Sequence, residues 1–257
     1  MDTFIVIAMI LAVLVGVALG LLGGGGSILT VPIFTLVLGI GMREAIVSSL
    51  FVVAVTSVVS TAFRVRRREV LWRVAAVFAA TTGLLGGVAG GMVGRFFPEP
   101  VLTGLFAAIM IVTAIAMMRR RREPTEPRQT RPITRAIRTV ATGLGVGVLT
   151  GALGAGGGFL IVPALTFLGL PIAAAVGTSL LVIAVNSSAG FLTQISAVAI
   201  QWPTVVTFTA LALAGSFIGL ALSRRLPSSG IRTGFAVLVL AVGLTMLTTL
   251  IVQTLSS

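Results

Sequence analysis

Two glycine clusters, one in each half of the chain, are the residues whose types and spacing point most directly to ligand chemistry. They span 23–27 and 154–158, and each is followed by a short apolar run and a proline. Glycine lets the backbone approach a ligand closely, and the free N–H groups of a helix start, with the positive end of the helix dipole, favour anions. We predict that short helices begin at Ser27 and Gly158 and that the two starts together bind a small anion. The residues predicted to form this pocket are Gly23, Gly24, Gly25, Gly26 and Ser27 in the first half and Gly154, Gly156, Gly157 and Gly158 in the second.

Small polar side chains recur at matched positions after each cluster. The pair Ser48 and Ser49 corresponds to Thr178 and Ser179, and Asn186 lies at the centre of an apolar segment. A carboxamide in hydrocarbon is unfavourable without a partner, so Asn186 either lines a ligand path or bonds to another helix. Hydroxyl groups in such helices commonly bond to a carbonyl one turn earlier, which is a structural role. We include all five residues among the candidate substrate-binding residues and keep both roles open.

The residue types that are absent argue against several kinds of function. The chain has no His, Lys, Tyr or Cys, and its six acidic residues all lie at segment ends or in loops. Intramembrane Asp, Glu and His residues are the usual groups of proton relays and cation sites, so a cation pump or a carboxylate-relayed proton antiporter is disfavoured. A metal-ligand cluster and a base that could activate Ser or Thr are missing too. We predict no enzymatic activity, no metal site and no cofactor.

The composition is that of an integral membrane protein. Hydrophobic residues make up 57% and charged residues 9% of the 257 positions, and the mean hydropathy is +1.17, whereas a soluble chain carries roughly 25% charged residues. Apolar runs of membrane-spanning length fill the chain almost from end to end, so we predict an all-α integral membrane protein. The first apolar segment has neither a basic region before it nor a cleavage site after it, which favours a retained span over a signal peptide.

Five apolar segments are predicted in each half, and the second of each set is short for a full crossing at about 1.5 Å per residue. Each glycine cluster therefore joins a long helix to a half-helix, and the segments amount to about 8 transmembrane helices. Broken helices at corresponding positions of two halves are typical of transporter binding sites. The predicted segments are 4–22, 27–40, 45–63, 72–95, 100–118, 139–153, 158–170, 174–200, 203–223 and 231–253.

An internal duplication organises the chain. Residues 45–57 match 175–187, and Trp72 aligns with Trp202. Correspondence over several segments in the same order indicates two homologous repeats. An Arg- and Pro-rich linker at 119–138 divides the chain, so the predicted domains are a first transmembrane repeat at 1–118 and a second at 139–257.

The arginines predict the orientation of these repeats. The net charge is +12, every basic residue is an arginine, and they cluster in loops at 64–73, 119–138 and 223–232. This is the positive-inside pattern of membrane insertion, and it argues against a nucleic-acid partner. All three loops lie on the cytoplasmic side only if the second repeat is inverted relative to the first. We predict inverted repeats, and whether the glycine-broken pairs cross fully or re-enter stays open.

Two motifs carry a resemblance to a known family. The first is the glycine break followed by Val-Pro, at 23–32 and 154–163, and the second is Ala-x-x-Ser/Thr-Ser-Leu, at 45–50 and 175–180. With both motifs duplicated in order, the chain resembles the sulfite exporter TauE/SafE family. The resemblance implies a prokaryotic inner-membrane permease that moves sulfite, organosulfonates or related anions, often outward. It also implies that Pro32 and Pro163 belong to the site, together with the glycine clusters and the Ser/Thr-Ser pairs.

These observations predict a secondary transporter that exports a small anion by alternating access at the interface of the repeats. A sulfur oxyanion or organosulfonate follows only from the resemblance, because family likeness does not fix a substrate. An anion channel-like pore and a non-transporting membrane scaffold or assembly protein are the alternatives. The predicted partners are the anionic solute and the lipid bilayer, while the exact substrate, the coupling ion and the oligomeric state stay open.

Overall fold

The part of the protein that the computed structural model describes consists of helices joined by short turns. This part comprises residues 3–23, 29–31, 33–87, 99–119, 132–152, 158–223, 225 and 228–255, and no strand occurs among them. The prediction of an all-α protein is confirmed for these residues.

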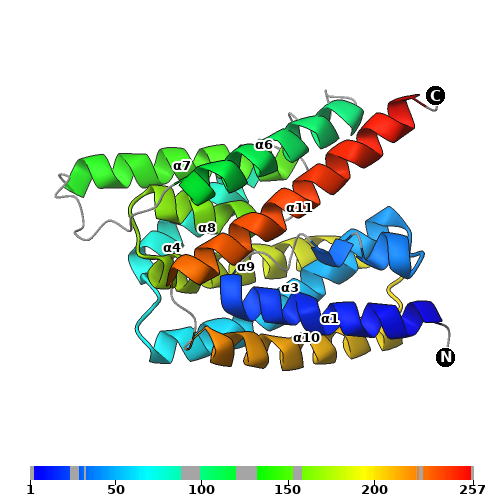
Figure 1. Cartoon of the computed structure of the whole chain (residues 1–257). Helices are drawn as coiled ribbons and strands as arrows, with labels where there is room; N and C mark the ends of the chain where they lie inside the picture. Colours follow the sequence, from blue (N-terminus) through cyan, green and yellow to red (C-terminus); the bar gives the residue numbers. More distant parts are fainter. Residues whose placement is uncertain are drawn as a thin grey trace.

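Long helices form the body of the molecule, and both chain ends lie at the same end of it (Figure 1). Two of the helical elements, η1 and η2, have π geometry, and η3 is a short 3₁₀ helix. In chain order the elements are α1 (Thr3–Leu22), η1 (Ile33–Val37), α3 (Met42–Arg66), α4 (Trp72–Ala79), η2 (Ala80–Gly87), α6 (Glu99–Arg119), α7 (Pro132–Ala152), α8 (Gly158–Phe167), α9 (Ile172–Gln194), η3 (Ile195–Ala197), α10 (Trp202–Leu222) and α11 (Ser228–Leu255).

Several helix starts agree with the sequence pattern. α4 and α10 begin at the aligned residues Trp72 and Trp202. Pro203 lies in the first turn of α10, where its missing N–H removes no helical hydrogen bond. α8 begins at Gly158, the predicted start of the second short helix.

Helix α7 begins earlier than its apolar segment. It starts at Pro132, whereas the apolar run was predicted to start at 139. Proline is preorganised for the first turn of a helix, and arginine is a good helix former. Arg135 and Arg138 therefore continue the helix beyond the apolar run, into the stretch that the sequence pattern assigns to the linker.

Among the described residues, three helical stretches are long and apolar enough to cross a membrane, namely Glu44–Arg66, Ile172–Gln194 and Trp202–Leu222. Shorter apolar stretches occur at Ile7–Leu21, Ile137–Val148 and Val239–Val252. A chain with several such helices is a multi-pass membrane protein. The count of about 8 crossings and the inverted repeats stay predictions.

Helices α3 and α9 pack against each other in antiparallel orientation. Leu50, in the first part of α3, faces Gly190 near the end of α9. At the opposite end, the backbone carbonyl of Glu69, just after α3, faces Gly177 near the start of α9. Because the contacts run in opposite order along the two helices, the helices are antiparallel, and each half of the chain contributes one of them. More than half of the apolar stretch of each helix is buried.

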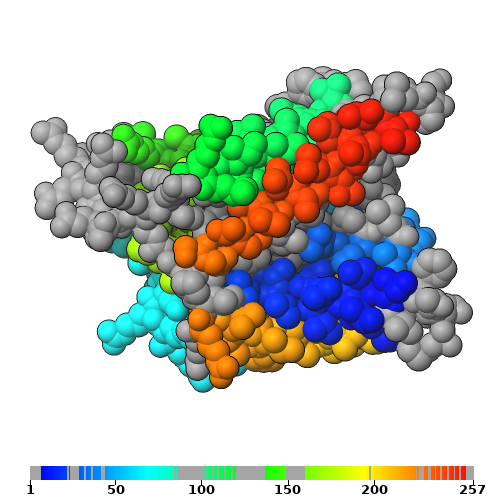
Figure 2. All heavy atoms as spheres, viewed as in Figure 1, coloured from blue at the N-terminus to red at the C-terminus, as the bar shows by residue number. Residues whose placement is uncertain are grey.

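Helices α1 and α10 make the closest backbone contact in the described part of the chain, and they lie directly together in the space-filling view (Figure 2). Glycines recur at four-residue spacing on both: Gly16 and Gly20 on α1, Gly215 and Gly219 on α10. A Cβ on any of the four would collide with a backbone oxygen of the facing helix. This is the small-xxx-small packing typical of membrane helices.

Two further pairs also join one half of the chain to the other. α6 and α11 cross on the same face in Figures 1 and 2. They are antiparallel, since Gly104 faces Leu250 while Gly243 faces Met110. α7 packs on η2, where Gly143 lies against the Thr81 side chain. Thus the first helix of each half packs on the fourth segment of the other half.

Candidate functional site

The first glycine cluster begins where α1 ends, against the second half of the chain. Gly23 has a φ of +82°, a left-handed conformation that glycine adopts without steric strain. A Cβ at Gly23 would lie 2.8 Å from Cγ1 of Val176 and 3.0 Å from Oγ of Ser179 on α9. The structure therefore joins a predicted glycine of one half to a predicted hydroxyl residue of the other. Gly24, Gly25, Gly26, Ser27 and Pro32 lie outside the described residues.

The second cluster leads into α8, which starts at Gly158 and contains Pro163. The helix continues through Pro163 to Phe167, although an interior proline removes one backbone hydrogen bond and usually kinks a helix. Pro163 is buried, and its carbonyl accepts a hydrogen bond from Oγ1 of Thr166 at 2.7 Å. Gly154, Gly156 and Gly157 lie outside the described residues.

The four residues of the Ser/Thr-Ser pairs are all buried. Ser49 donates to the carbonyl of Ile46 and Ser179 donates to that of Val176, both at 2.8 Å. Oγ1 of Thr178 accepts the backbone N–H of Leu71 at 3.1 Å. Ser48 is the exception, since its hydroxyl has no partner among the described residues.

Asn186 bonds across helices. Its Nδ2 donates to Oγ1 of Thr82 in η2 at 2.9 Å, and Thr82 in turn donates to the carbonyl of Phe78 at 2.6 Å. A Cβ at Gly83 would lie 2.6 Å from Oδ1 of Asn186, so glycine makes room for the amide. Asn186 is only half-buried. The interhelical bond satisfies one N–H of the carboxamide.

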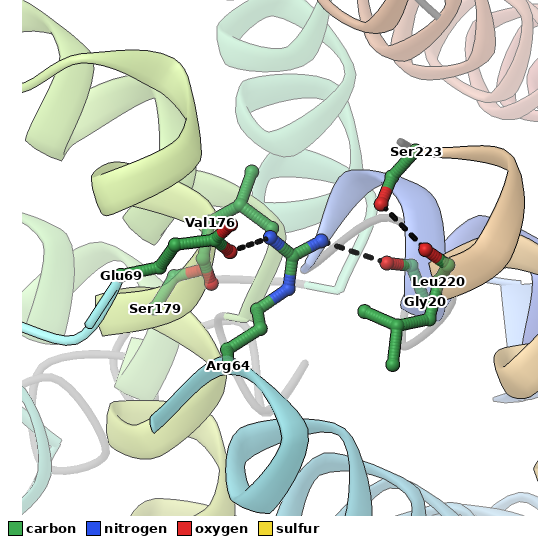
Figure 3. Close-up of polar contacts among 7 residues, drawn as sticks. All are labelled: Gly20, Arg64, Glu69, Val176, Ser179, Leu220 and Ser223. Atoms are coloured by element: carbon green, nitrogen blue, oxygen red, sulfur yellow. Dashed lines mark hydrogen bonds and ion pairs between the residues drawn. The ribbon is translucent and has the colours of Figure 1, made fainter. Parts of the chain in front are cut away.

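Arg64, which the charge pattern assigned to a loop, lies inside the bundle. α3 continues to Arg66, so Arg64 is part of its last turn and is 3% exposed. Its Nη1 donates to Oε2 of Glu69 at 2.6 Å, and its Nη2 donates to the carbonyl oxygen of Gly20 at 2.9 Å (Figure 3). The assignment of Arg64 to a solvent-facing loop is therefore wrong, because a carboxylate and a carbonyl within the bundle hold its guanidinium.

A Schellman motif at the end of α3 places Glu69 beside Arg64. The N–H of Glu69 bonds to the carbonyl of Arg64 at 3.1 Å, and the N–H of Arg68 bonds to that of Val65 at 3.0 Å. Arg68 has a φ of +57° at the position where this motif usually has glycine. The motif often brings two hydrophobic side chains together, and here it brings together an ion pair.

A row of buried hydroxyl groups follows α3 up to Arg64. Ser57, Ser60 and Thr61 lie seven, four and three residues before it, a spacing that puts side chains on one face of a helix. They are 0%, 2% and 6% exposed. Their hydroxyls and the Nε of Arg64 have no partner among the described residues. Buried polar groups nearly always have partners, so these four groups are available to a ligand or to water.

Helical spacing was the signal that could have revealed this row. The two serines and Thr61 lie on the same face of the helix as Arg64. An arginine at the end of an apolar segment, however, usually extends toward the membrane–water interface. Its burial depends on Glu69 and Gly20, which helical spacing alone does not bring near. Elsewhere in the described part of the chain, no group of three His, Cys, Asp or Glu residues could hold a metal ion.

Comparison with known proteins gives this helical membrane bundle its class. The chain matches the family model described as Sulfite exporter TauE/SafE over residues 8–246, and it belongs to this family. The resemblance carried by the duplicated motifs is thereby confirmed.

Three relatives have the same description, probable membrane transporter protein. One from Xylella fastidiosa (strain Temecula1) is 33% identical over 239 residues, covering 90% of each chain. One from Haemophilus influenzae is 25% identical over 266 residues, covering 96% of this chain and 99% of the relative. One from Methanocaldococcus jannaschii is 28% identical over 204 residues, covering 73% and 72%. The chain is a membrane transporter by family and not an enzyme.

Proposed function

We propose that this transporter exports a small anion, a sulfur oxyanion or an organosulfonate, by alternating access between two inverted repeats. The observation that carries the proposal is the meeting of Gly23, Ser179 and the buried Arg64 where α1, α3 and α9 come together. A glycine break, a helix with small hydroxyl residues and a guanidinium are the groups that bind an anion at membrane depth. The family adds the sulfur chemistry.

The packing of the helices supports the inverted arrangement. α3 pairs with α9 and α6 with α11, each pair made of sequence-matched elements in antiparallel orientation. α1 packs on α10 as α7 packs on α4 and η2. Two repeats related by a twofold axis in the membrane plane produce this exchange of partners. Movement of one repeat against the other would then expose the site to each side in turn.

The proposed site includes residues of both repeats. Two hydrogen bonds join the halves. Leu71, which follows α3, donates its N–H to Thr178 in α9. Gln201, which follows α9, donates its N–H to Glu44 in the first turn of α3. These contacts between the halves support a site built from residues of both. The substrate-binding residues we propose are Gly23, Gly24, Gly25, Gly26, Ser27, Pro32, Ser48 and Ser49 with Gly154, Gly156, Gly157, Gly158, Pro163, Thr178, Ser179 and Asn186.

The proposed location is the cytoplasmic membrane of a prokaryote. The relatives come from bacteria and an archaeon. The arginine-rich stretches at 64–73, 119–138 and 223–232 are proposed to face the cytoplasm, apart from the buried Arg64. The positive-inside rule supports this orientation.

Ligand-dependent stabilisation tests the proposal. The purified protein is heated with sulfite, sulfate, thiosulfate, sulfoacetate, taurine, chloride and a set of cations. A ligand at about 100 times its Kd stabilises the folded state by about 2.7 kcal/mol, so the transported anion raises the melting temperature selectively. Gly23→Val, whose side chain would strike Val176 and Ser179, should abolish that rise, while Gly145→Val, in open space on α7, should keep it. Stabilisation by cations alone would refute the proposal.

A further inference from the structure

We propose that Arg64 binds the transported anion directly, and that Glu69 occupies the same guanidinium when no anion is bound. The inference rests on the proposed anion transport and adds a binding residue, an exchangeable counter-ion and the charge of the substrate. The ligand class is a monoanion with several oxygens on one sulfur centre, such as a sulfonate or hydrogensulfite.

Arg64 is fixed in its position. Its side chain is 4% exposed, and its Nη2 donates to the carbonyl of Gly20 in the last turn of α1. Carbonyls in that turn lack partners within their own helix, so Arg64 caps α1 directly before the glycine cluster. Arg64 is buried, whereas Arg66, Arg68, Arg73 and Arg225 are exposed. Its planar guanidinium donates several hydrogen bonds in a geometry that suits an oxyanion.

Glu69 is the partner that is free to leave. Its side chain is 22% exposed, and it lies between α3 and α4, outside both helices. The Schellman bond to the carbonyl of Arg64 holds its backbone, so the carboxylate is free to rotate toward solvent while α3 stays in place. Figure 3 shows the guanidinium between Glu69 on one side and Gly20 on the other. An anion therefore replaces Glu69 without breaking the cap on α1.

The hydroxyl row supplies the remaining donors. Ser60 and Thr61 lie one turn before Arg64 on α3, and Ser57 lies two turns before it. Leaving a buried hydroxyl without a partner is unfavourable, and these three have none within the described residues. An oxyanion held by Arg64 would provide acceptors for the O–H groups of Ser60 and Thr61, one turn away, whereas Ser57 lies about 10 Å along the helix axis and is too far away to contact it. Nε of Arg64, also without a partner, is a further donor to the anion.

The charge of the pair predicts the charge of the ligand. Arg64 and Glu69 together are neutral, so a monoanion that takes the place of Glu69 keeps the guanidinium neutralised. A dianion would leave one buried negative charge uncompensated, which is strongly unfavourable. The site therefore prefers a sulfonate to sulfate, although both present oxygens around a sulfur atom.

The second half of the chain has no equivalent of this ion pair. The residue aligned with Arg64 is Gln194, which is exposed and bonds to the carbonyl of Gly190 in its own helix. The residue aligned with Glu69 is Ala199. The duplicated glycine clusters are thus combined with a guanidinium at one end of the α3–α9 pair only. The anion binds asymmetrically, at the end where α1 and α3 finish.

A purely structural ion pair is the alternative, and a paired replacement distinguishes the two. Exchanging both members of a buried ion pair for apolar residues of similar size often preserves stability. Arg64→Met combined with Glu69→Leu should therefore fold with a melting temperature near that of the wild type. If the pair binds substrate, this double variant loses the response to anions, and if the pair is structural, the response stays.

The experiment measures the melting temperature of the purified protein against increasing methanesulfonate, a monoanion, or sulfate, a dianion, with sodium gluconate as the reference salt. For the wild type, the half-stabilising concentration should be at least about tenfold lower for methanesulfonate. Arg64→Lys keeps the charge but loses the planar fork, so it should raise that concentration by about tenfold or more. Glu69→Gln should melt lower without anion and respond to less methanesulfonate, because the competing carboxylate is gone.

Matched variants separate the proposal from general effects. Arg66→Lys changes an exposed arginine at the same helix end, and Glu44→Gln changes a carboxylate at the opposite end, so both should respond like the wild type. A double variant or Arg64→Lys with the wild-type half-stabilising concentration would overturn the role of Arg64 while leaving anion transport intact. A wild type that no anion stabilises would overturn the proposed function together with this inference. Stronger stabilisation by sulfate would refute the monoanion site.

Discussion

Arg68 is the residue whose backbone conformation sets the ion pair in place. Its φ of +57° puts it in the left-handed region, which is unfavourable by about 1–2 kcal/mol for a residue with a side chain. Such a conformation persists only where surrounding contacts determine it. Here the two Schellman hydrogen bonds do so, and they bring Glu69 back to Arg64.

Substitution of Arg68 tests this strain. Arg68→Gly removes the steric conflict and should raise unfolding stability by up to about 1 kcal/mol. Arg68→Val, with a β-branched side chain, should lower it by about 1–2 kcal/mol. Thermal unfolding in detergent measures both. Equal melting temperatures for the Gly and Val variants would show that the left-handed turn is not retained.

Substitution of Asn186 and Thr82 distinguishes a structural role of the Asn186 side chain from a role in substrate binding. A double-mutant cycle with Asn186→Leu and Thr82→Val should give a coupling free energy of about 0.6 kcal/mol, the usual size for interhelical bonds in membranes. A role in the path predicts that Asn186→Leu also raises the half-stabilising anion concentration, while Thr82→Val does not. An unchanged concentration in both variants would assign Asn186 to packing alone.

The predictability of the site varied from residue to residue for physical reasons. Gly23 and Ser179 were predicted because duplicated motifs point to them, and the structure brings the two together. Arg64 was missed because its partners lie in another helix and in the turn after its own. Burial of a charge depends on such tertiary contacts, whereas the charge pattern records only position along the chain.

At the scale of elements, the α1–α10 pair is held together by close packing of the two backbones. Backbone atoms of the two helices touch at every fourth residue, where glycine leaves room. Without a hydrophobic driving force inside a bilayer, such close packing supplies much of the association between helices. α1 also ends at the proposed site, so its packing positions Gly20 and Gly23.

Valine substitution on these faces should disrupt the pair. Gly16→Val or Gly215→Val pushes a branched side chain into a facing backbone oxygen, so we expect destabilisation of about 3 kcal/mol or more, at the upper end for overpacked sites. Gly145→Val, where nothing lies within 4 Å, is the matched control. Melting temperature and monodispersity report the outcome. Wild-type behaviour of Gly16→Val would mean that the helices do not touch as described.

Three helix starts agree with the sequence pattern. The aligned tryptophans mark the starts of α4 and α10, and Gly158 marks that of α8. α7 departed from the pattern because a helix is continued by good helix formers beyond its apolar part. Hydropathy finds the buried length of a helix and not its full length.

On the scale of the whole molecule, the pairs α1–α10, α3–α9 and α6–α11 each combine a helix of the first half with one of the second. Pairing of matched elements is consistent with the duplication read from the sequence, and it makes the halves interdependent. Residues Glu44 and Gln201 meet at one end of the α3–α9 pair, while Glu69 and Gly177 meet at the other. The number of membrane crossings was beyond sequence reasoning, because length and hydropathy do not distinguish a tilted span from a re-entrant one.

Cysteine labelling tests the inverted arrangement, and a chain without cysteine gives no background. Single cysteines at exposed Gly41 and Gln201 should react with a membrane-impermeant maleimide added outside intact cells. Cysteines at exposed Arg68 and Arg225 should react only after the membrane is opened. Reaction of the cysteine at 225 from outside would indicate that the second repeat has the same orientation as the first.

Counterflow in proteoliposomes shows whether this protein carries a small anion by saturable exchange. Vesicles loaded with unlabelled methanesulfonate or, at mildly acidic pH, hydrogensulfite are diluted into a trace of the same labelled monoanion, and its uptake is followed. We expect transient accumulation of the labelled anion that saturates with concentration and that is lost in the Arg64→Met, Glu69→Leu variant. Uptake that rises linearly with concentration and shows no counterflow would contradict alternating access, and no uptake of any anion would contradict anion transport itself.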